Sequence, residues 1–391
     1  MKVSLFFDNY QPFHEDKDPG QIIFGLIENG FKADLITLEK KELLNYHPSF
    51  PLIKVAKKEE FYSNNFWSKL DSDLIIFYSW LSKVYTPIVK VIKASGKKVL
   101  IKADNDGCIG YPLLTHQLKT PLFKGSFVKN VFHQIEWRLH LKSFYSENIE
   151  QIELSDGVII ESPDALSNLN YFLTNWGRKD LIQKNYFVPN PVTPEFINCQ
   201  VGKKENIVIA VGRWEDEVPK NTKLMVETLT EFLEYKKDYR AVIVGSGKKN
   251  VEKFLRGVSK EIKNRIEITG PKEHGKIKDF LLPAKIFFMP SRWESFGIAG
   301  AEALCCGCSL AGTPLEALRY LSMQGFSGTT ASSFKKEAVL AALIQESIKW
   351  ERNYYFPEKI SEFWKAKLDR KKIAKEIREI IKGNPSTGLR G

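Results

Sequence analysis

The chain has 391 residues, of which 43% are hydrophobic and 27% are charged, close to the composition of ordinary globular proteins. This composition excludes disordered, collagen-like and low-complexity chains, and the length predicts two or three domains rather than one. The formal net charge of +11 lies wholly in residues 196–391, because residues 1–195 carry equal numbers of basic and acidic side chains. No recognisable nucleic-acid-binding module accompanies this charge, so we expect no nucleic-acid partner.

The sequence contains no segment that would carry the chain into or across a membrane. No apolar run approaches the ~18 residues of a membrane-spanning helix. At the N-terminus, Asp8 interrupts the apolar run before a signal-peptide core could form. Five cysteines, an odd number, fit a reducing compartment better than a disulfide framework. We therefore expect a cytoplasmic protein.

Short runs of Val, Ile and Phe alternate with segments of helical period in both halves of the chain. This is the pattern of parallel strands joined by crossover helices, so the fold class is α/β. Strands are expected at 3–7, 34–38, 74–78, 99–102, 158–161 and 186–188, and again at 207–211, 241–244, 266–269, 286–289 and 309–311. The restart of the pattern near residue 207 predicts a second domain that is built like the first.

The domain boundary is expected in a proline-rich segment. Three prolines in 189–194 forbid regular structure, which places a first domain at 1–193 and a second at 194–350. After these domains a helical pattern resumes, and we expect a C-terminal helical segment, 351–384, that returns to the first domain. The remaining residues, 385–391, are expected to be a disordered tail.

The densest functional pattern of the second half lies around the end of a predicted strand. The strand ends at Pro290, the following loop carries Glu294, and a helix begins near Gly297. Glycine lets the backbone approach a ligand closely, and the free amides of a helix start favour an anion such as phosphate. Glu294 can then reach a hydroxyl-rich group, and Glu302 on the helix can hold a vicinal diol such as ribose.

Two other strand ends carry residues that suit the same ligand. Arg213 follows the first strand of the second domain, and Lys220 begins the next helical pattern, so together they could neutralise a diphosphate. The glycine turn at 245–247 is not specific, because ordinary strand-to-helix turns also use glycine. Loops of parallel sheets bind ligands at the carboxyl ends of the strands, so two such domains facing each other would bind across a cleft.

A metal site is suggested by three closely spaced cysteines, Cys305, Cys306 and Cys308. Zinc and iron–sulfur sites use four ligands, and no fourth is placed nearby in the sequence. We interpret them as buried small residues and expect no metal.

The second half resembles the retaining glycosyltransferases of family 4, the glycosyl transferases group 1, which have the GT-B fold. The resemblance covers about residues 186–315 and rests on Pro290-Ser291, Glu294, Phe296-Gly297, Glu302-Ala303, Gly307 and Thr313-Pro314, preceded by Gly212-Arg213, Lys220, 245–247 and 268–270. It implies two Rossmann-like parallel-sheet domains facing a cleft. It also implies a nucleoside-diphosphate sugar as co-substrate, with no further cofactor.

By this resemblance, individual residues receive roles. Arg213 and Lys220 hold the diphosphate, Glu294 contacts the transferred sugar and Glu302 contacts the ribose. The full set of implied residues is catalytic Arg213, Lys220 and Glu294, with donor-binding Gly20, Gly212, Gly245, Thr269, Ser295, Phe296, Gly297, Ile298 and Glu302. The chain departs from the family at Asn221, where glycine is usual, and at Gly20, which is a single glycine where the family often has two.

The first domain offers candidates for the acceptor side. Asp104 and Asp106 follow the buried run 99–103, where a carboxylate could orient or deprotonate an acceptor hydroxyl. An Asx turn that caps the loop explains the same residues equally well. In addition, the basic and aromatic segment 119–145 has helical period; it fits either a helix that lies on an anionic membrane or an ordinary helix packed on its own domain.

These observations favour a retaining glycosyltransferase, of the hexosyltransferase class, that moves a sugar to an acceptor hydroxyl of a glycan or lipid-linked glycan. It would be cytoplasmic or peripheral to a membrane, and its partners would be a nucleotide sugar and that acceptor. Two alternatives remain: a phosphorylase or epimerase of the GT-B fold, and a non-catalytic sugar-binding or nucleotide-binding protein.

Overall fold

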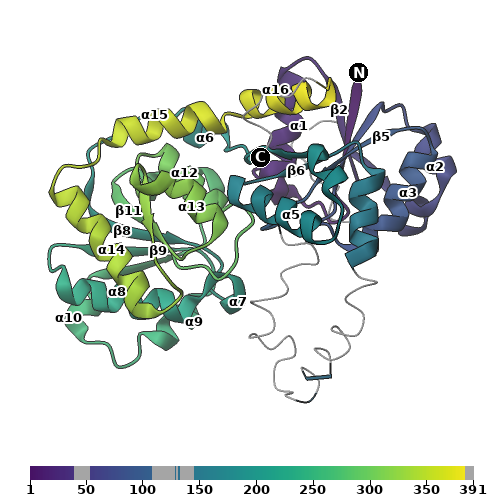
Figure 1. Ribbon diagram of the computed structural model, residues 1–391. Helices are drawn as coiled ribbons and strands as arrows, with labels where there is room; N and C mark the ends of the chain where they lie inside the picture. Colours follow the sequence, from purple (N-terminus) through teal and green to yellow (C-terminus); the bar gives the residue numbers. More distant parts are fainter. Residues whose placement is uncertain (39–52, 108–127, 129–130, 133–144, 384–391) are drawn as a thin grey trace. The chain divides into compact units, whose positions relative to one another are not determined.

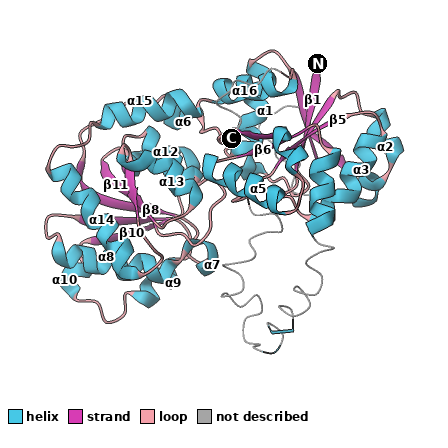
Figure 2. Cartoon of the chain, viewed as in Figure 1, coloured by secondary structure: helices cyan, strands magenta, loops and turns pink. Residues whose placement is uncertain are grey.

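The computed structural model describes residues 1–38, 53–107, 128, 131–132 and 145–383 (Figure 1). The chain forms two compact units. Unit 1 comprises Met1–Pro191 with Arg370–Gly391, and unit 2 comprises Val192–Asp369. In each unit the strands lie in the middle with helices around them (Figure 2). No helix of the described residues is long and apolar enough to span a bilayer.

Unit 1 contains a seven-stranded sheet in the order β3-β2-β1-β4-β5-β6-β7, and every neighbouring pair is parallel. The strands are β1 (Lys2–Phe6), β2 (Lys32–Leu38), β3 (Ile53–Ala56), β4 (Leu74–Tyr78), β5 (Lys98–Lys102), β6 (Gly157–Ile160) and β7 (Asn185–Phe187). The helices are α1 (Asp18–Glu28), α2 (Asn64–Lys69), α3 (Thr86–Ala94), α5 (Pro163–Asn175) and α16 (Arg370–Ile381).

The central strand β4 shows why this sheet needs helices on both faces. All five of its side chains are buried. Ile75 and Phe77 belong to one hydrophobic cluster, whereas Leu74, Ile76 and Tyr78 belong to another. Successive side chains of a strand point to opposite faces, so both faces of the sheet are covered, as is typical of parallel sheets.

The C-terminal helix α16 packs on α1, although the two are far apart in the sequence (Figure 1). Its Ile373 and Ile377 join the hydrophobic cluster that contains Ile22 and Ile23 of α1. The helices approach closely at Gly25, where a Cβ atom would lie 2.4 Å from the carbonyl oxygen of Arg370. Glycine at this position therefore permits the contact.

Unit 2 contains a six-stranded parallel sheet in the order β10-β9-β8-β11-β12-β13. The strands are β8 (Glu205–Val211), β9 (Arg240–Val244), β10 (Ile266–Gly270), β11 (Ala284–Met289), β12 (Ser309–Gly312) and β13 (Gly328–Thr330). The helices are α6 (Pro194–Ile197), α7 (Glu217–Lys220), α8 (Thr222–Tyr235), α9 (Lys248–Phe254), α10 (Lys260–Lys263), α11 (Ile277–Leu281), α12 (Ile298–Cys305), α13 (Glu316–Ser322), α14 (Lys336–Glu351) and α15 (Pro357–Leu368).

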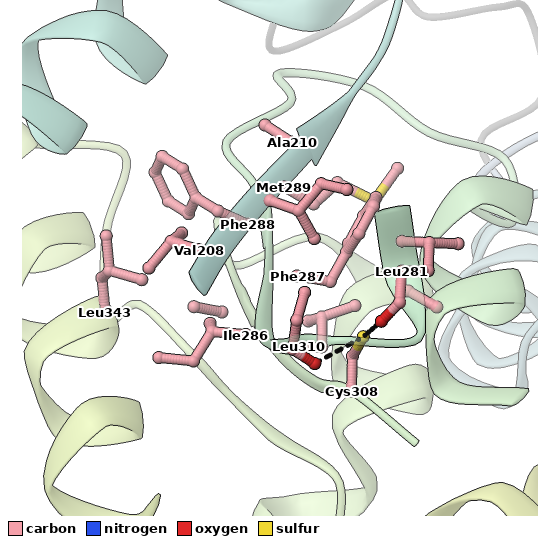
Figure 3. Close-up of a cluster of buried hydrophobic side chains, with 14 of the residues drawn as sticks. Val208, Ala210, Leu281, Ile286, Phe287, Phe288, Met289, Cys308, Leu310 and Leu343 are labelled. Atoms are coloured by element: carbon pink, nitrogen blue, oxygen red, sulfur yellow. Dashed lines mark hydrogen bonds between the residues drawn. The ribbon is translucent and has the colours of Figure 1, made fainter. Parts of the chain in front are cut away.

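The core of unit 2 is built around the buried strand β11, whose apolar side chains pack with those of β8 and β12 (Figure 3). The thiol of Cys308 lies in this core and donates to the carbonyl oxygens of Leu281 and Ala284, at 3.2 and 3.3 Å. Cys305 and Cys306 are also fully buried. The expected burial of these cysteines is confirmed, and they act here as small core residues.

The C-terminal part of the chain differs from the single returning segment, 351–384, that the sequence predicts. Helix α15 packs on unit 2 through Ile360, Trp364 and Leu368, whereas α16 packs on unit 1. The change occurs at Asp369, whose extended backbone (φ −61°, ψ 129°) ends α15. Both helices have an apolar stripe of helical period, so the pattern does not reveal which core each stripe joins. The predicted tail, 385–391, lies outside the described residues.

Gly25 provides a test of the contact between α1 and α16. Because an added Cβ would meet backbone rather than a movable side chain, we expect Gly25→Ala to lower the free energy of unfolding by about 1–3 kcal/mol. Urea unfolding measures this. Gly202→Ala is the matched control, since its Cβ would enter open space. Equal stability of the two variants would contradict a close approach at Gly25.

Candidate active site

The candidate site of unit 2 lies where its strand order reverses. In the sheet, β8 lies between β9, which follows it in the sequence, and β11. The strand order therefore runs outward on one side through β9 and β10, and on the other side through β11, β12 and β13. Crevices at the carboxyl ends of strands at such a switch point are the usual ligand sites of open α/β sheets. The connections after β8 and β11 carry Arg213, Lys220 at the end of α7, and Glu294, the three residues for which the resemblance implies a catalytic role.

The loop between β11 and α12 is anchored by one buried side chain and turned by one glycine. Phe296 is fully buried in the core, so only its backbone can face a ligand. Gly297 adopts the left-handed conformation (φ 82°) that glycine tolerates best and is the N-cap of α12. As a glycine it brings no capping side chain, and the first amides of a helix have no partner within it. Gly297 and Ile298 thus offer backbone donors for an anion, whereas Ser295 lies two residues before the N-cap.

Glu294 lies at the centre of a polar cluster. Its Oε1 accepts a hydrogen bond from Lys220 Nζ at 2.6 Å and another from Ser291 Oγ at 2.7 Å. The Glu294 side chain is 11% exposed and that of Lys220 is 20% exposed. The structure therefore brings together Lys220 from the loop after β8 and Glu294 from the loop after β11.

Asn221 explains how Lys220 is held despite the departure from the family pattern. Its backbone is left-handed (φ 57°, ψ 49°), and asparagine is among the few residues besides glycine that adopt this conformation routinely. The buried side chain donates to the carbonyl oxygen of Pro290 at 3.1 Å and accepts from Arg292 Nε at 3.1 Å. Asparagine thus supplies the turn that glycine would provide, and it also fastens the two loops to each other.

Arg213 is more exposed than Lys220. Its side chain is 61% exposed, and its Nε donates to Asp216 Oδ2 at 2.7 Å. An exposed ion pair of this kind contributes about 0–1 kcal/mol. Exchange of Asp216 for a phosphate oxygen would therefore cost little.

Three predicted donor-binding residues have packing roles in the structure. A Cβ on Gly245 would lie 1.8 Å from the carbonyl oxygen of Gly212, so these two strand ends need the glycine for their own contact. Thr269 is the last but one residue of β10, and its hydroxyl donates to the carbonyl oxygen of Gly270 at 2.9 Å. In unit 1, a Cβ on Gly20 in α1 would lie 2.4 Å from the carbonyl oxygen of Glu15. The glycines are accounted for by packing without any ligand.

Glu302 is a buried residue of α12. It is 3% exposed, and its Oε1 lies 2.6 Å from Nε2 of His274. His274 belongs to a short 3-10 helix, His274–Lys276, and packs edge-on against Phe196. The pair with His274 fixes one carboxylate oxygen and thereby the orientation of the other. The sequence does not single out His274, because it lies in a polar loop without a motif.

In unit 1, the loop after β5 separates the two acceptor-side candidates. The Asx turn expected there is made by Asn105, whose Oδ1 accepts from the amide of Gly107 at 2.9 Å. Asp104 instead accepts from Trp80 Nε1 at 3.1 Å through Oδ2, and Asp106 contributes its backbone carbonyl to Asn168. The side chain of Asp104 therefore does not cap the loop.

A buried ion pair lies near Asp104 and was not predicted from the sequence. Lys102 ends β5 and pairs with Glu161, which follows β6, and both side chains are almost fully buried. Asp18 at the start of α1 accepts from the hydroxyl of Tyr78 at 2.6 Å. The available signal was a lysine directly after the apolar run Val99–Ile101 of β5.

The described residues contain no group of three or more His, Cys, Asp or Glu that could hold a metal ion. The basic side chains Arg213 and Lys220, with the amides at the start of α12, are the groups in unit 2 that suit a diphosphate. The segment 119–145, predicted to be an amphipathic helix, lies almost entirely outside the described residues.

The two parallel Rossmann-like sheets, one in each unit, define a protein of the GT-B class. Residues 195–362, nearly the whole of unit 2, match the family model described as "Glycosyl transferases group 1". This match covers less than half of the chain, so it is a finding about unit 2. The match is to group 1 as a whole and does not separate family 4 within it.

Individual relatives are distant. The chain is 29% identical over 96 residues to the tRNA-queuosine alpha-mannosyltransferase of Drosophila melanogaster, a match that covers 25% of this chain and 25% of the relative. It is 26% identical over 118 residues to an uncharacterized glycosyltransferase of Methanocaldococcus jannaschii, over 29% of this chain and 33% of that one. Matches to the curated relatives span between a quarter and a third of their length.

Solved structures resemble the chain along almost its whole length. Sucrose-phosphate synthase of Thermosynechococcus elongatus has a TM-score of 0.66 and 14% identity, over 98% of both chains. HepE of Anabaena in complex with UDP has the same TM-score and identity, over 98% of this chain and 100% of that one; HepE has also been solved with UDP-glucose. At this identity the likeness shows the fold.

Asn221 provides a test of the loop geometry. Asn221→Gly keeps the turn but loses two side-chain hydrogen bonds, each of which contributes about 0.5–1.5 kcal/mol. Asn221→Ala should cost about 1–2 kcal/mol more, because alanine disfavours the left-handed conformation. Denaturant unfolding measures both. As a control, Asn353→Gly replaces another left-handed asparagine, which is exposed, and should be nearly neutral. The opposite order for the two Asn221 variants would refute this account.

Proposed function

We propose that the protein is a retaining glycosyltransferase that moves a sugar from a nucleoside-diphosphate sugar to an acceptor hydroxyl. The observation that carries the proposal is the Lys220–Glu294 contact at the switch point of unit 2, beside the start of α12. It places a cation and a carboxylate where a diphosphate and a sugar would meet. The match of residues 195–362 to the glycosyl transferases group 1 model supports the same reaction class.

In this mechanism the protein acts mainly on the leaving group. The bond between the anomeric carbon and the diphosphate oxygen breaks, and its electron pair stays on the diphosphate. Arg213, Lys220 and the first amides of α12 stabilise the negative charge that develops there. Lys220 has three N–H donors, so it can bind a phosphate oxygen while it remains bonded to Glu294. The acceptor oxygen then bonds to the same face of the sugar, and no metal ion or further cofactor is required.

The nucleoside would be held by Glu302. With one carboxylate oxygen fixed by His274, the other is available for the hydroxyls of a ribose. The complexes of HepE with UDP and UDP-glucose support a nucleotide sugar as the donor.

For the acceptor we propose a glycan or lipid-linked glycan, used in the cytoplasm or at the membrane surface. Carboxylates at the strand ends of unit 1 suit hydroxyl groups. Contact with an anionic membrane through 119–145 remains part of this proposal.

Product analysis separates this function from its alternatives. A panel of nucleotide sugars is first ranked by thermal stabilisation, since a ligand at 100 times its Kd stabilises by about 2.7 kcal/mol. The best donor is then incubated with and without acceptors. Transfer with retained configuration supports the proposal. Conversion of the donor alone would indicate an epimerase, orthophosphate dependence a phosphorylase, and binding without turnover a non-catalytic protein.

The cations should matter for turnover. We expect Arg213→Ala and Lys220→Ala each to raise the barrier by about 2–4 kcal/mol, because each removes positive charge from the leaving group. Initial-rate assays measure this, and activity should survive thorough chelation. Lys223→Ala, an exposed lysine one turn further on, is the control. Wild-type rates in Lys220→Ala would remove the lysine from the mechanism, and a strict divalent-metal requirement would contradict it.

The role of Glu302 can be tested with nucleotides that lack ribose hydroxyls. Glu302→Gln should weaken binding of the ribonucleoside diphosphate, because a charged hydrogen bond to the diol is lost. Wild type should bind the 2′-deoxy and 3′-deoxy nucleotides more weakly, and Glu302→Gln should lower their affinity less than it lowers that of the ribonucleotide. Calorimetric titration gives all of these affinities. An equal loss for ribo and deoxy ligands would show that Glu302 does not contact the hydroxyls.

A further inference from the structure

Two cysteine thiols of unit 2 are in contact with each other. Cys199 follows α6, Cys306 is the C-cap of α12, and their Sγ atoms are 3.8 Å apart. Both are free thiols. They are 107 positions apart in the sequence, so the fold alone brings them together. Helix α12 packs against α6 and α15 within the same unit (Figure 1).

The two thiols differ in their access to solvent. Cys199 is partly exposed, whereas Cys306 is fully buried. A dissolved oxidant can therefore reach Cys199 but not Cys306. Cys306 also differs from Cys308, whose thiol is bonded to backbone carbonyl oxygens in the core. The contact of Cys306 is a second sulfur, which is a group with which a thiol can form a covalent bond.

Two lysines make the surroundings of this pair positive. Nζ of Lys365 in α15 donates to the carbonyl oxygen of Cys199, and Nζ of Lys204 donates to that of Cys306 at 2.7 Å. The hydrogen bond with Cys306 lowers the pKa of the Cys199 thiol below its ordinary range, and the two lysines lower it further. The same hydrogen bond, together with burial, raises the pKa of Cys306. Cys199 is thus the thiolate of the pair, and a partly exposed thiolate in positive surroundings is the reactive form of cysteine.

The pair is connected to Glu302 from two sides. The amide of Cys306 donates to the carbonyl oxygen of Glu302 at 3.1 Å, at the end of α12. Sγ of Cys199 lies 3.0 Å from the carbonyl oxygen of Phe196 in α6. The ring of Phe196 packs edge-on against His274, which is paired with the carboxylate of Glu302. A bond between the two sulfurs would therefore join the two segments that support the Glu302–His274 pair.

We propose that Cys199 and Cys306 form a redox-active pair that a peroxide converts to a disulfide, and that this bond displaces Glu302. The Cys199 thiolate attacks one oxygen of hydrogen peroxide, the O–O bond breaks, and the hydroxide that leaves takes up the proton released by Cys199. The Cys306 sulfur then attacks the sulfenic acid, the S–O bond breaks, and hydroxide leaves with the proton of Cys306 as water. Two thiols are oxidised, and one peroxide is reduced to two waters. An added dithiol reverses the change by thiol–disulfide exchange.

The thiol chemistry is independent of the reaction that the protein catalyses, whereas its effect on nucleoside binding rests on the proposed role of Glu302. A disulfide brings its two sulfurs to about 2.05 Å, so the end of α12 and the segment after α6 must move toward each other. We expect this movement to change the orientation of the Glu302 carboxylate and to weaken the binding of a nucleoside diphosphate.

Peptide mapping tests whether the disulfide forms. Wild-type protein is treated with hydrogen peroxide, blocked with iodoacetamide and digested with trypsin without reduction. We expect peptide 185–203, which contains Cys199, to be cross-linked to peptide 293–319, and dithiothreitol should separate them. Absence of this cross-link from the oxidised wild type would overturn the proposal.

Variants identify the partner, because peptide 293–319 contains Cys305, Cys306 and Cys308. In Cys306→Ser we expect no cross-link, and Cys199 should stop at the sulfenic acid, which dimedone labels. Cys308→Ser is the matched control and should still form the cross-link. A cross-link that persists in Cys306→Ser would overturn the assignment of the pair.

Alkylation rates test which thiol reacts first. The rate at which iodoacetamide modifies Cys199 is measured against pH on peptide 185–203. We expect a midpoint below the value of about 8.5 for a free cysteine. Lys365→Gln should raise this midpoint, because it removes a positive charge. Lys367→Gln, whose ammonium lies over the ring of Phe363, should leave it unchanged. An ordinary midpoint in the wild type would show that Cys199 is not the attacking thiolate.

Nucleotide affinity tests the connection to Glu302. The nucleoside diphosphate that binds best to reduced protein is titrated calorimetrically before and after oxidation. We expect oxidation to weaken its binding about fivefold or more, which is the usual scale of coupling between two sites. Dithiothreitol should restore the affinity, and Cys199→Ser should show no loss. Unchanged affinity in protein that carries the disulfide would overturn the effect on Glu302. If reduced wild type binds no nucleoside diphosphate and transfers no sugar, the proposed function fails, whereas peptide mapping still decides the thiol chemistry.

Discussion

Both units depend on one constraint of parallel sheets. A parallel strand can follow its neighbour only through a crossover, so helices cover both faces and the strands become apolar throughout. Most polar side chains then lie at strand ends and in loops, although Ser4 of β1 and Asp34 of β2 are buried within their strands. All five positions of β4 are buried, and Tyr78 is the last of them. Strand β11 has six residues and ends just before Pro290 and Ser291. The candidate chemistry of each unit is therefore found at the carboxyl edge of its sheet, next to the point where the strand order reverses.

The charges at these two edges are arranged differently. In unit 2, Lys220 and Arg213 are paired with Glu294 and Asp216 in contacts that are at least partly exposed. The exposed Arg213–Asp216 pair can exchange readily with an anionic ligand, because little desolvation holds it together. Lys220 can keep its bond to Glu294 and offer its remaining N–H donors. In unit 1, the Lys102–Glu161 pair is buried and cannot exchange, so it acts as a fixed support. Arg213 and Lys220 are thus open to an anion, whereas the buried Lys102 is committed to Glu161.

Residues other than glycine adopt left-handed backbone conformations at the carboxyl edge of each sheet. Asn221 in unit 2 uses its conformation to fasten the loop after β8 to the loop after β11. Trp80 and Asp104 in unit 1 use theirs to connect the ends of β4 and β5. In each case side-chain hydrogen bonds stabilise a conformation that the residue type alone would leave sparsely populated. These bonds connect loops that are distant in the sequence, which is how two separate strand ends form one site.

Much of this protein follows from its sequence, because hydrophobic period and turn chemistry are local. The eleven predicted strands are all present, whereas β3 and β13 were missed because they are short, with few buried positions. The roles expected of Glu294 and Lys220 came from the order of the motifs. The tertiary structure decided the rest. It determines which core receives α15 and which receives α16, and it shows that Asn221 replaces glycine without loss of the turn. It also shows that Asn105 rather than Asp104 caps its loop, and that Glu302 is paired with His274. Each of these depends on contacts between segments far apart in the chain, and such contacts leave no periodic trace in the sequence.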